Sequence, residues 1–228
     1  MKCIFSNAAV AIILSLSFVS CELDNYDGPD AQIYGEVRDI ETGKLIQQDI
    51  NGSKIMYEEL GYENPDRQQM IFKVSGEYRN NLMFSGRYDI YFEESNFVIP
   101  EPLEAYEIKP GENRLDFQVM PYIRISDASI RREGTELVAT FTVTPTVDYN
   151  VLRVGFFGHI DYIVGDSYAQ DRATQDVNES FKDQSRTYTL RMPASSFESG
   201  QAYYFRVGAL VDYPNAKYNY APSVRLKI

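Results

Sequence analysis

Leu115-Asp116-Phe117-Gln118-Val119-Met120-Pro121 is the segment from which the architecture of this 228-residue chain follows most directly. Leu115, Phe117 and Val119 alternate with polar residues, and alternation with a period of two is typical of a strand with one buried face. Pro121 then interrupts the pattern, because proline has no amide hydrogen to donate to a strand ladder. We therefore predict that a strand ends here and that a second domain begins at Pro121.

The same alternation recurs on both sides of Pro121 and predicts strands in both halves of the chain. It is found at residues 33–37, 70–74, 88–92, 137–143, 152–156, 203–209 and 224–228. No window has a helical period, and the 18 Tyr and 13 Phe also favour strands. The predicted fold class is all-β, with two tandem antiparallel β-sandwiches over residues 32–120 and 121–228, each of the usual size for one sandwich.

The first residues have the parts of a secretory signal. Lys2 is followed by an apolar run over residues 8–19 and then by Ser20-Cys21. This run is too short to span a bilayer, which takes roughly 20 apolar residues. A cysteine that directly follows a small residue at such a position resembles the bacterial lipobox, although Phe18 stands where the common lipobox has leucine.

The resemblance to the lipobox implies a signal peptide over residues 1–20, a lipid on Cys21, and an acidic tether over residues 21–31. The alternative is an ordinary cleaved signal in which the cysteine has no role. Cys3, the other cysteine of the chain, lies in the segment that would be removed. We therefore expect no intramolecular disulfide in the mature protein.

The charge balance excludes two classes of partner. The chain has 22 basic and 33 acidic residues, which gives a net charge of −11. Nucleic acids bind basic surfaces, so no nucleic-acid partner is expected. Attachment to anionic lipid by charge is excluded for the same reason. Contact with a membrane is thus expected through the lipid anchor only.

The beginning of the first domain has the features of a hairpin. In Ile33-Tyr-Gly35-Glu-Val37-Arg-Asp39-Ile-Glu-Thr42-Gly43, the Asp39 carboxylate can cap its own turn, and Gly43 can adopt a backbone conformation that other residues avoid. Together with the turn at Gly76 and the strand around Tyr88, this pattern resembles the carboxypeptidase-regulatory-like family, which is similar to transthyretin. The resemblance implies a prealbumin-type Greek-key sandwich that serves as a scaffold and has no catalytic residues.

A second resemblance covers the end of the chain. The segment Phe197-Glu-Ser199-Gly-Gln-Ala-Tyr203-Tyr-Phe-Arg-Val207 is similar to the L-x-P-G-x-x-Y-x-x-R-V segment of fibronectin type III modules. It implies an immunoglobulin-like sandwich in which Tyr203 forms a tyrosine corner with the backbone upstream. Ser199 replaces the usual proline, and the chain lacks the tryptophan that such modules have.

As a whole, the chain resembles a Bacteroidota family of two-domain lipoproteins of unknown function. The segments that carry this resemblance are Cys21-Glu-Leu-Asp-Asn-Tyr-Asp-Gly-Pro-Asp30 and Val119-Met-Pro-Tyr-Ile-Arg-Ile125. Members are typically encoded beside starch-utilisation-type transporters. The resemblance implies an outer-membrane, cell-surface location, with an oligosaccharide or components of a glycan transporter as partners.

Residues suited to catalysis or to metal binding are scarce. His159 is the single histidine, and Asp161 could orient it, but no G-x-S-x-G elbow supplies a nucleophile. A zinc site would need several His or Cys ligands. We therefore predict no catalytic residues, no cofactor and no metal site of this type, and we do not expect an enzyme.

Residues 160–185 are polar and rich in Asp and Glu, and we expect them to form one long loop without regular structure. Calcium binding by the carboxylates of this segment remains an alternative, although no EF-hand pattern occurs. Tyrosines concentrate around this loop and the last hairpin, and sugar rings stack on flat aromatic rings. The candidate ligand-binding residues are Tyr162, Tyr168, Tyr213, Tyr218 and Tyr220, with Tyr149 close to them. Ordinary packing of these rings is the alternative.

The hypothesis from sequence is thus a non-catalytic, lipid-anchored surface protein that assists polysaccharide binding or uptake. The alternative function is a structural or adhesive module that binds another protein and no glycan. Exposed tyrosines gathered at one end of a domain would favour the first function, whereas a broad apolar patch across both domains would favour the second.

Overall fold

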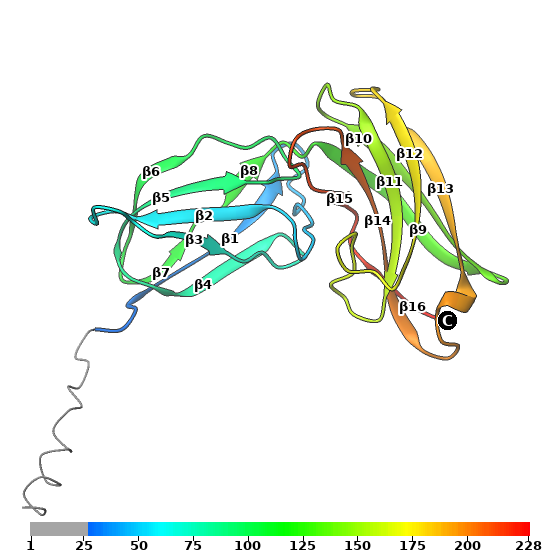
Figure 1. The fold of residues 1–228 in the computed structure, drawn as a ribbon, viewed down its shortest axis with the longest axis horizontal. Coiled ribbons are helices and arrows are strands. Elements are labelled where there is room, and N and C mark those ends of the chain that lie inside the picture. Colours follow the sequence, from blue (N-terminus) through cyan, green and yellow to red (C-terminus); the bar gives the residue numbers. More distant parts are fainter. Residues whose placement is uncertain (1–26) are drawn as a thin grey trace, which may run out of the picture.

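The computed structural model describes residues 27–228, which form two β-sandwiches lying side by side (Figure 1). The predicted signal peptide, the lipidated Cys21 and most of the predicted tether lie outside these residues. Within residues 27–228, no helix has the length and apolar character required to cross a membrane. The all-β prediction is confirmed, since one 3-10 turn at Ala194–Ser196 is the sole helical element in this part of the chain.

The first domain consists of two sheets packed face to face. One sheet has the order β4-β1-β7, with β8 also paired to β1, and the other has the order β3-β2-β5-β6. Their strands are β1 (Ala31–Asp39), β2 (Lys54–Glu59), β3 (Arg67–Met70), β4 (Glu77–Met83), β5 (Gly86–Glu93), β6 (Leu103–Ile108), β7 (Gly111–Arg114) and β8 (Phe117–Val119). Strand β1 pairs in parallel with β7 and β8, which differs from the purely antiparallel prediction. The reason is that the chain arrives at β7, beside β1, from β6 of the opposite sheet and not from β1 through a hairpin.

The second domain is antiparallel throughout. A three-stranded sheet, β13-β10-β9, packs on a five-stranded sheet, β12-β11-β14-β15, in which β16 also pairs with β14. The strands are β9 (Ile123–Glu133), β10 (Glu136–Pro145), β11 (Val151–His159), β12 (Asp171–Glu179), β13 (Arg186–Pro193), β14 (Ala202–Val211), β15 (Asn219–Tyr220) and β16 (Val224–Lys227). This is the arrangement expected of an immunoglobulin-like sandwich.

Three local predictions are confirmed by hydrogen bonds and backbone angles. The hydroxyl of Tyr203 accepts a hydrogen bond from the amide of Glu198 (3.1 Å), which is the predicted tyrosine corner. Asp39 caps its turn by accepting from the amide of Glu41 (3.0 Å). Gly43 closes the same turn with φ +68°, a conformation that a side chain would strain.

The prediction of one long loop over residues 160–185 is wrong, because this segment contains strand β12. Ala173 and Val177 pack on the core of the second domain, and the residues between them are polar. This alternation is too weak to recognise without the partner strand. The antiparallel ladder with β11, which pairs Phe156 with Ala173, provides the backbone hydrogen bonds that hold the segment extended.

The two domains are joined by a buried polar junction. Arg206 of β14 points away from the core of its own domain, and its exposed fraction is 1%. Its guanidinium donates to Ala221 O (2.9 Å) in the second domain and to Gln48 O (2.7 Å) in the first. Weaker bonds reach Gln47 Oε1, Val74 O and Val164 O. One side chain thus binds the backbone of both domains.

A second set of hydrogen bonds fixes the loop that follows β5. The side-chain amide of Asn96, which is fully buried, donates to Tyr218 O (3.0 Å) across the junction. Asn219 donates in return to Asn96 O (2.7 Å). Because buried polar groups are costly unless they are paired, these reciprocal bonds favour one relative position of the domains.

Candidate ligand-binding cleft

A cleft of about 480 Å³ lies at the junction of the two domains. One wall is formed by Val98 and Ile99, which follow β5 in the first domain. The other wall is formed by three connections of the second domain, and they contribute Asp148, Tyr149, Lys182 and Tyr213. The volume is within the range of small-molecule sites, roughly 300–1,000 Å³.

The two exposed tyrosines of the cleft form a pair. The ring centroids of Tyr149 and Tyr213 are 4.6 Å apart, and the ring planes make an angle of 36°. Their exposed fractions are 37% and 40%. Beneath them, the buried ring of Tyr122 lies at 84° to Tyr149 and 53° to Tyr213. Tyr122 thus packs against both exposed rings on their buried side.

The strand register explains why Tyr149 and Tyr213 meet. Val151 of β11 pairs with Val211 of β14, so the residues just before β11 and just after β14 are neighbours. The amide of Asp212 donates to Asn150 O (2.9 Å) and holds the two connections together. Two residues that are far apart in the sequence therefore occupy one corner of the domain.

The polar groups of the cleft have both signs of charge. Asp148 supplies acceptors and Lys182 supplies donors, and both side chains are exposed. Burial raises the pKa of the Tyr122 hydroxyl, which therefore stays protonated at neutral pH. The site can offer hydrogen bonds to hydroxyl groups, but it has no arrangement of a nucleophile with a general base.

Two of the five tyrosines predicted to bind a ligand are buried. The exposed fraction of Tyr218 and of Tyr220 is 6% each, so neither belongs to an exposed platform. The Tyr220 hydroxyl donates to Asp49 Oδ2 (2.7 Å) in the first domain and accepts from the amide of Asp166 (2.9 Å). Burial, followed by the nearby Asp49 carboxylate, raises its pKa well above the ordinary value. The Tyr220 side chain thus serves the contact between the domains, whereas the Tyr218 ring packs within the second domain, against Phe157 and Tyr220.

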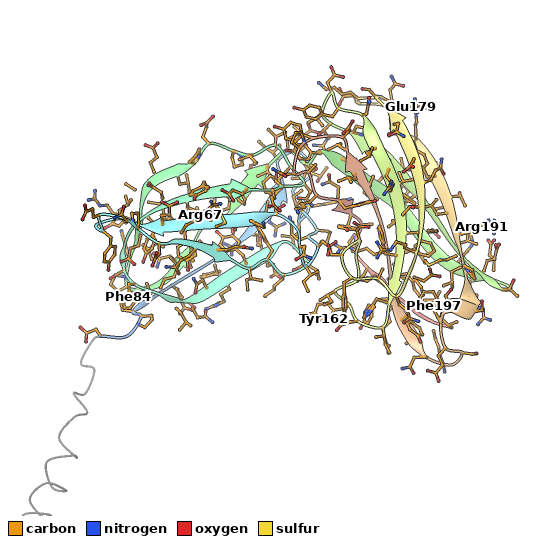
Figure 2. All side chains as sticks on the ribbon, in the orientation of Figure 1. Arg67, Phe84, Tyr162, Glu179, Arg191 and Phe197 are labelled. Carbon is orange, nitrogen blue, oxygen red and sulfur yellow. The ribbon has the colours of Figure 1, made fainter. Side chains whose placement is uncertain are left out.

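The other three predicted tyrosines are exposed but belong to two separate places. Tyr213 lines the cleft, whereas Tyr162 and Tyr168 lie in the connection between β11 and β12, where Tyr168 packs on the ring of His159 at 4.1 Å. Figure 2 shows Tyr162 at the opposite end of the second domain from Glu179, the last residue of β12. The five residues therefore do not form one platform, and ligand binding at Tyr162 or Tyr168 stays a prediction.

His159 is used in a local turn. Its Nδ1 accepts a hydrogen bond from the amide of Asp161 (2.9 Å), so this nitrogen cannot at the same time donate to the Asp161 carboxylate. The triad geometry considered from the sequence is therefore not formed. Among residues 27–228, no group of three or more His, Cys, Asp or Glu side chains is placed to hold a metal ion.

A second cleft, of about 450 Å³, is also lined by both domains, by the turn after β1 and by the beginning of β9. Within it, Arg124 of β9 donates to both carboxylate oxygens of Asp39 (2.7 and 2.9 Å). Burial alone would raise the pKa of Asp39, but the hydrogen bonds from Arg124 and the turn outweigh it, and the pKa is lowered. Since both charges are satisfied by each other, we interpret this pair as a clamp between the domains.

No sequence pattern indicates that Val98, Ile99 and Lys182 belong to a site. They come from different domains or distant loops, and each is an ordinary surface residue in its local context. Tyr149 was noticeable only as one of a concentration of tyrosines. Its pairing with Tyr213 depends on the register of β11 and β14, which is a tertiary property.

The fold and the cleft define a class of protein, an all-β two-domain protein with an aromatic cleft at the domain junction. The chain belongs to the DUF3823 family. Residues 31–120 match the DUF3823 N-terminal domain, described as a protein of unknown function, and residues 123–225 match DUF3823_C, a domain of unknown function. No curated protein matches the chain.

Several solved structures are similar over both domains. A "putative carbohydrate binding protein" from Bacteroides uniformis is 32% identical with a TM-score of 0.80, over 88% of this chain and 100% of that one. DUF3823 family proteins from Bacteroides uniformis and Parabacteroides merdae have a TM-score of 0.74 each, at 18% and 22% identity, with the same coverage. The last two show a common fold.

Proposed function

We propose that the protein is a non-catalytic carbohydrate-binding protein that is held at the outer membrane by a lipid on Cys21. The observation that carries the binding function is the exposed pair Tyr149–Tyr213, with Asp148 and Lys182 beside it in one cleft. Flat rings contact the C–H faces of sugars, and the neighbouring charges can bond to sugar hydroxyls. The relative from Bacteroides uniformis, named for carbohydrate binding, supports this proposal.

The anchor is supported by the lipobox-like sequence around Cys21. Acyl chains contribute about 0.8 kcal/mol per buried methylene, so a multiply acylated cysteine would hold the protein firmly. A Cys21→Ser variant should appear in the soluble fraction of cells after export. Continued partition with membranes would contradict the anchor and would leave the binding function unaffected.

The binding function is tested with a glycan array and then by calorimetry on the purified protein. Tyr149→Ala and Tyr213→Ala should each weaken the binding of the best glycan by at least about tenfold, equivalent to 1.4 kcal/mol, because each removes a central aromatic contact. Tyr62→Ala is the control, since it removes an exposed tyrosine that lies outside the cleft and is not a candidate for ligand binding. Equal affinity of all three variants and the unaltered protein would refute the site.

A further inference from the structure

One wall of the cleft consists of exposed apolar side chains of the first domain. Val98 and Ile99 have exposed fractions of 45% and 44%, and they border the same cavity as the tyrosine pair. Single exposed apolar residues are common on protein surfaces. Two consecutive ones that flank an aromatic pair from another domain extend the apolar contact area across the junction.

The distance between the two walls is fixed before any ligand binds. The amide of Val98 donates to Met120 O (2.9 Å) in the linker, and Asn96 O accepts from the amide of Tyr122 (3.0 Å). Just before this loop, Glu94 pairs with Lys217 of the second domain (2.7 Å). A preformed cleft avoids the cost of ordering loops on binding.

The size of the cleft is larger than one sugar ring requires. A hexose has about a dozen heavy atoms, and even at the roughly 30 Å³ that a water molecule occupies in the liquid, one ring would leave part of the cleft empty. The available volume of about 480 Å³ extends from the tyrosine pair to the wall of the first domain. This favours a chain of linked sugars over a single one.

The charges of the cleft favour an uncharged ligand. The charges of Asp148 and Lys182 offset each other, so the cleft offers no net attraction to a carboxylate or sulfate group, whereas a sugar hydroxyl can donate to Asp148 and accept from Lys182. The net charge of −11 over the whole chain repels any polyanion.

We propose that the ligand is a neutral oligosaccharide that crosses the domain junction, with one sugar on Tyr149 and Tyr213 and a neighbouring sugar against Val98 and Ile99. This inference rests on the proposed carbohydrate-binding function. It adds to that function the ligand's charge and length and the requirement for both domains.

The experiment is calorimetry with two sets of ligands and one variant. The ligands are neutral mono-, di- and hexasaccharides from the glucan, xylan and mannan series, and the anionic polymers polygalacturonate and heparin. The variant Ile99→Ser is measured against the best neutral ligand. Affinity should rise from mono- to hexasaccharide and be absent for the polyanions. Ile99→Ser should weaken the hexasaccharide about fivefold, because roughly one kcal/mol of apolar contact is lost. Ile71→Ser, the same change at a more exposed isoleucine of the same domain outside the cleft (78% against 44% for Ile99), should leave the affinity unchanged.

The outcomes separate this inference from the proposed function. If Tyr149→Ala abolishes binding and Ile99→Ser does not weaken it, the cleft binds carbohydrate but the ligand does not cross the junction. Preferred binding of a polyanion, or equal affinity for mono- and hexasaccharides, would also overturn the inference alone. If no neutral or anionic probe binds, both the inference and the proposed function fail.

Discussion

Replacing Arg206 with Met should weaken the junction between the domains. The guanidinium is buried and makes two short hydrogen bonds, to Gln48 O (2.7 Å) and Ala221 O (2.9 Å), and it lies over the ring of Tyr220 at 4.2 Å. Burial lowers the pKa of Arg206 to about 10, so the side chain is still charged at neutral pH. The native junction therefore contains a cation whose partners are mainly backbone carbonyls.

The expected magnitude follows from these contacts. Each carbonyl left without a partner costs about 1–3 kcal/mol, and Gln48 O and Ala221 O are the two most affected. Part of the loss is offset because Met has no charge to desolvate. We expect the Arg206→Met protein to lose about 2–4 kcal/mol of unfolding free energy. Arg206→Lys should also be destabilised, because one ammonium group cannot reproduce the planar fork of donors.

The assay is urea unfolding followed by tyrosine fluorescence and by circular dichroism, since the chain has no tryptophan. The unaltered protein should unfold in one transition, and the Arg206→Met protein should show separate transitions for the two domains. Arg225→Met, an exposed change on β16, is the control and should stay within about 0.5 kcal/mol. A single transition with an unchanged midpoint in Arg206→Met would show that Arg206 does not hold the two domains together.

Three further predictions concern buried hydroxyls and acid sensitivity. Tyr203→Phe should lower the stability of the second domain by about 1 kcal/mol in thermal unfolding, because the tyrosine corner loses its hydrogen bond; an unchanged midpoint would contradict this. Tyr218→Phe should leave stability equal or higher, because the buried hydroxyl has no hydrogen-bond partner within residues 27–228, and a clear loss would show that it has one in solution. Hydrogen bonds from Lys217 and then Lys54 lower the pKa of Glu94 to about 2 from 4.5. The contribution of Glu94 to stability is therefore complete above pH 4.5 and is lost as the pH falls toward 2. The difference in unfolding midpoint between the unaltered protein and Glu94→Gln should disappear over this pH range. A difference that is independent of pH would argue against the ion pairs.

Local chemistry made much of the fold predictable. The alternation around Phe117 and the break at Pro121 depend on neighbouring residues only, and the same holds for the turn at Asp39 and Gly43 and for the tyrosine corner at Tyr203. In each case a side chain acts on backbone a few residues away. Such interactions are encoded in short segments and can be recognised without the rest of the chain.

Elements with weak local patterns are not predictable from their own residues. Strand β12 is polar apart from Ala173 and Val177, and its extended form depends on hydrogen bonds to β11. The parallel pairing of β1 with β7 and β8 likewise depends on the path of the chain between two sheets. Strand pairing is a non-local interaction, so the sequence of one strand does not show which strand it pairs with.

The all-β class, the local turns and the abundance of tyrosines thus follow from the residues alone. Which of these tyrosines a ligand can reach depends on how the two domains fold and pack. Tyr220 is covered at the domain junction and Tyr218 is covered by Phe157 and Tyr220, whereas Tyr149 and Tyr213 remain exposed beside Ile99. The physical reason is that exposure and pairing depend on surfaces from separate parts of the chain, and these surfaces meet only when the buried hydrogen bonds of the junction fix the two domains together.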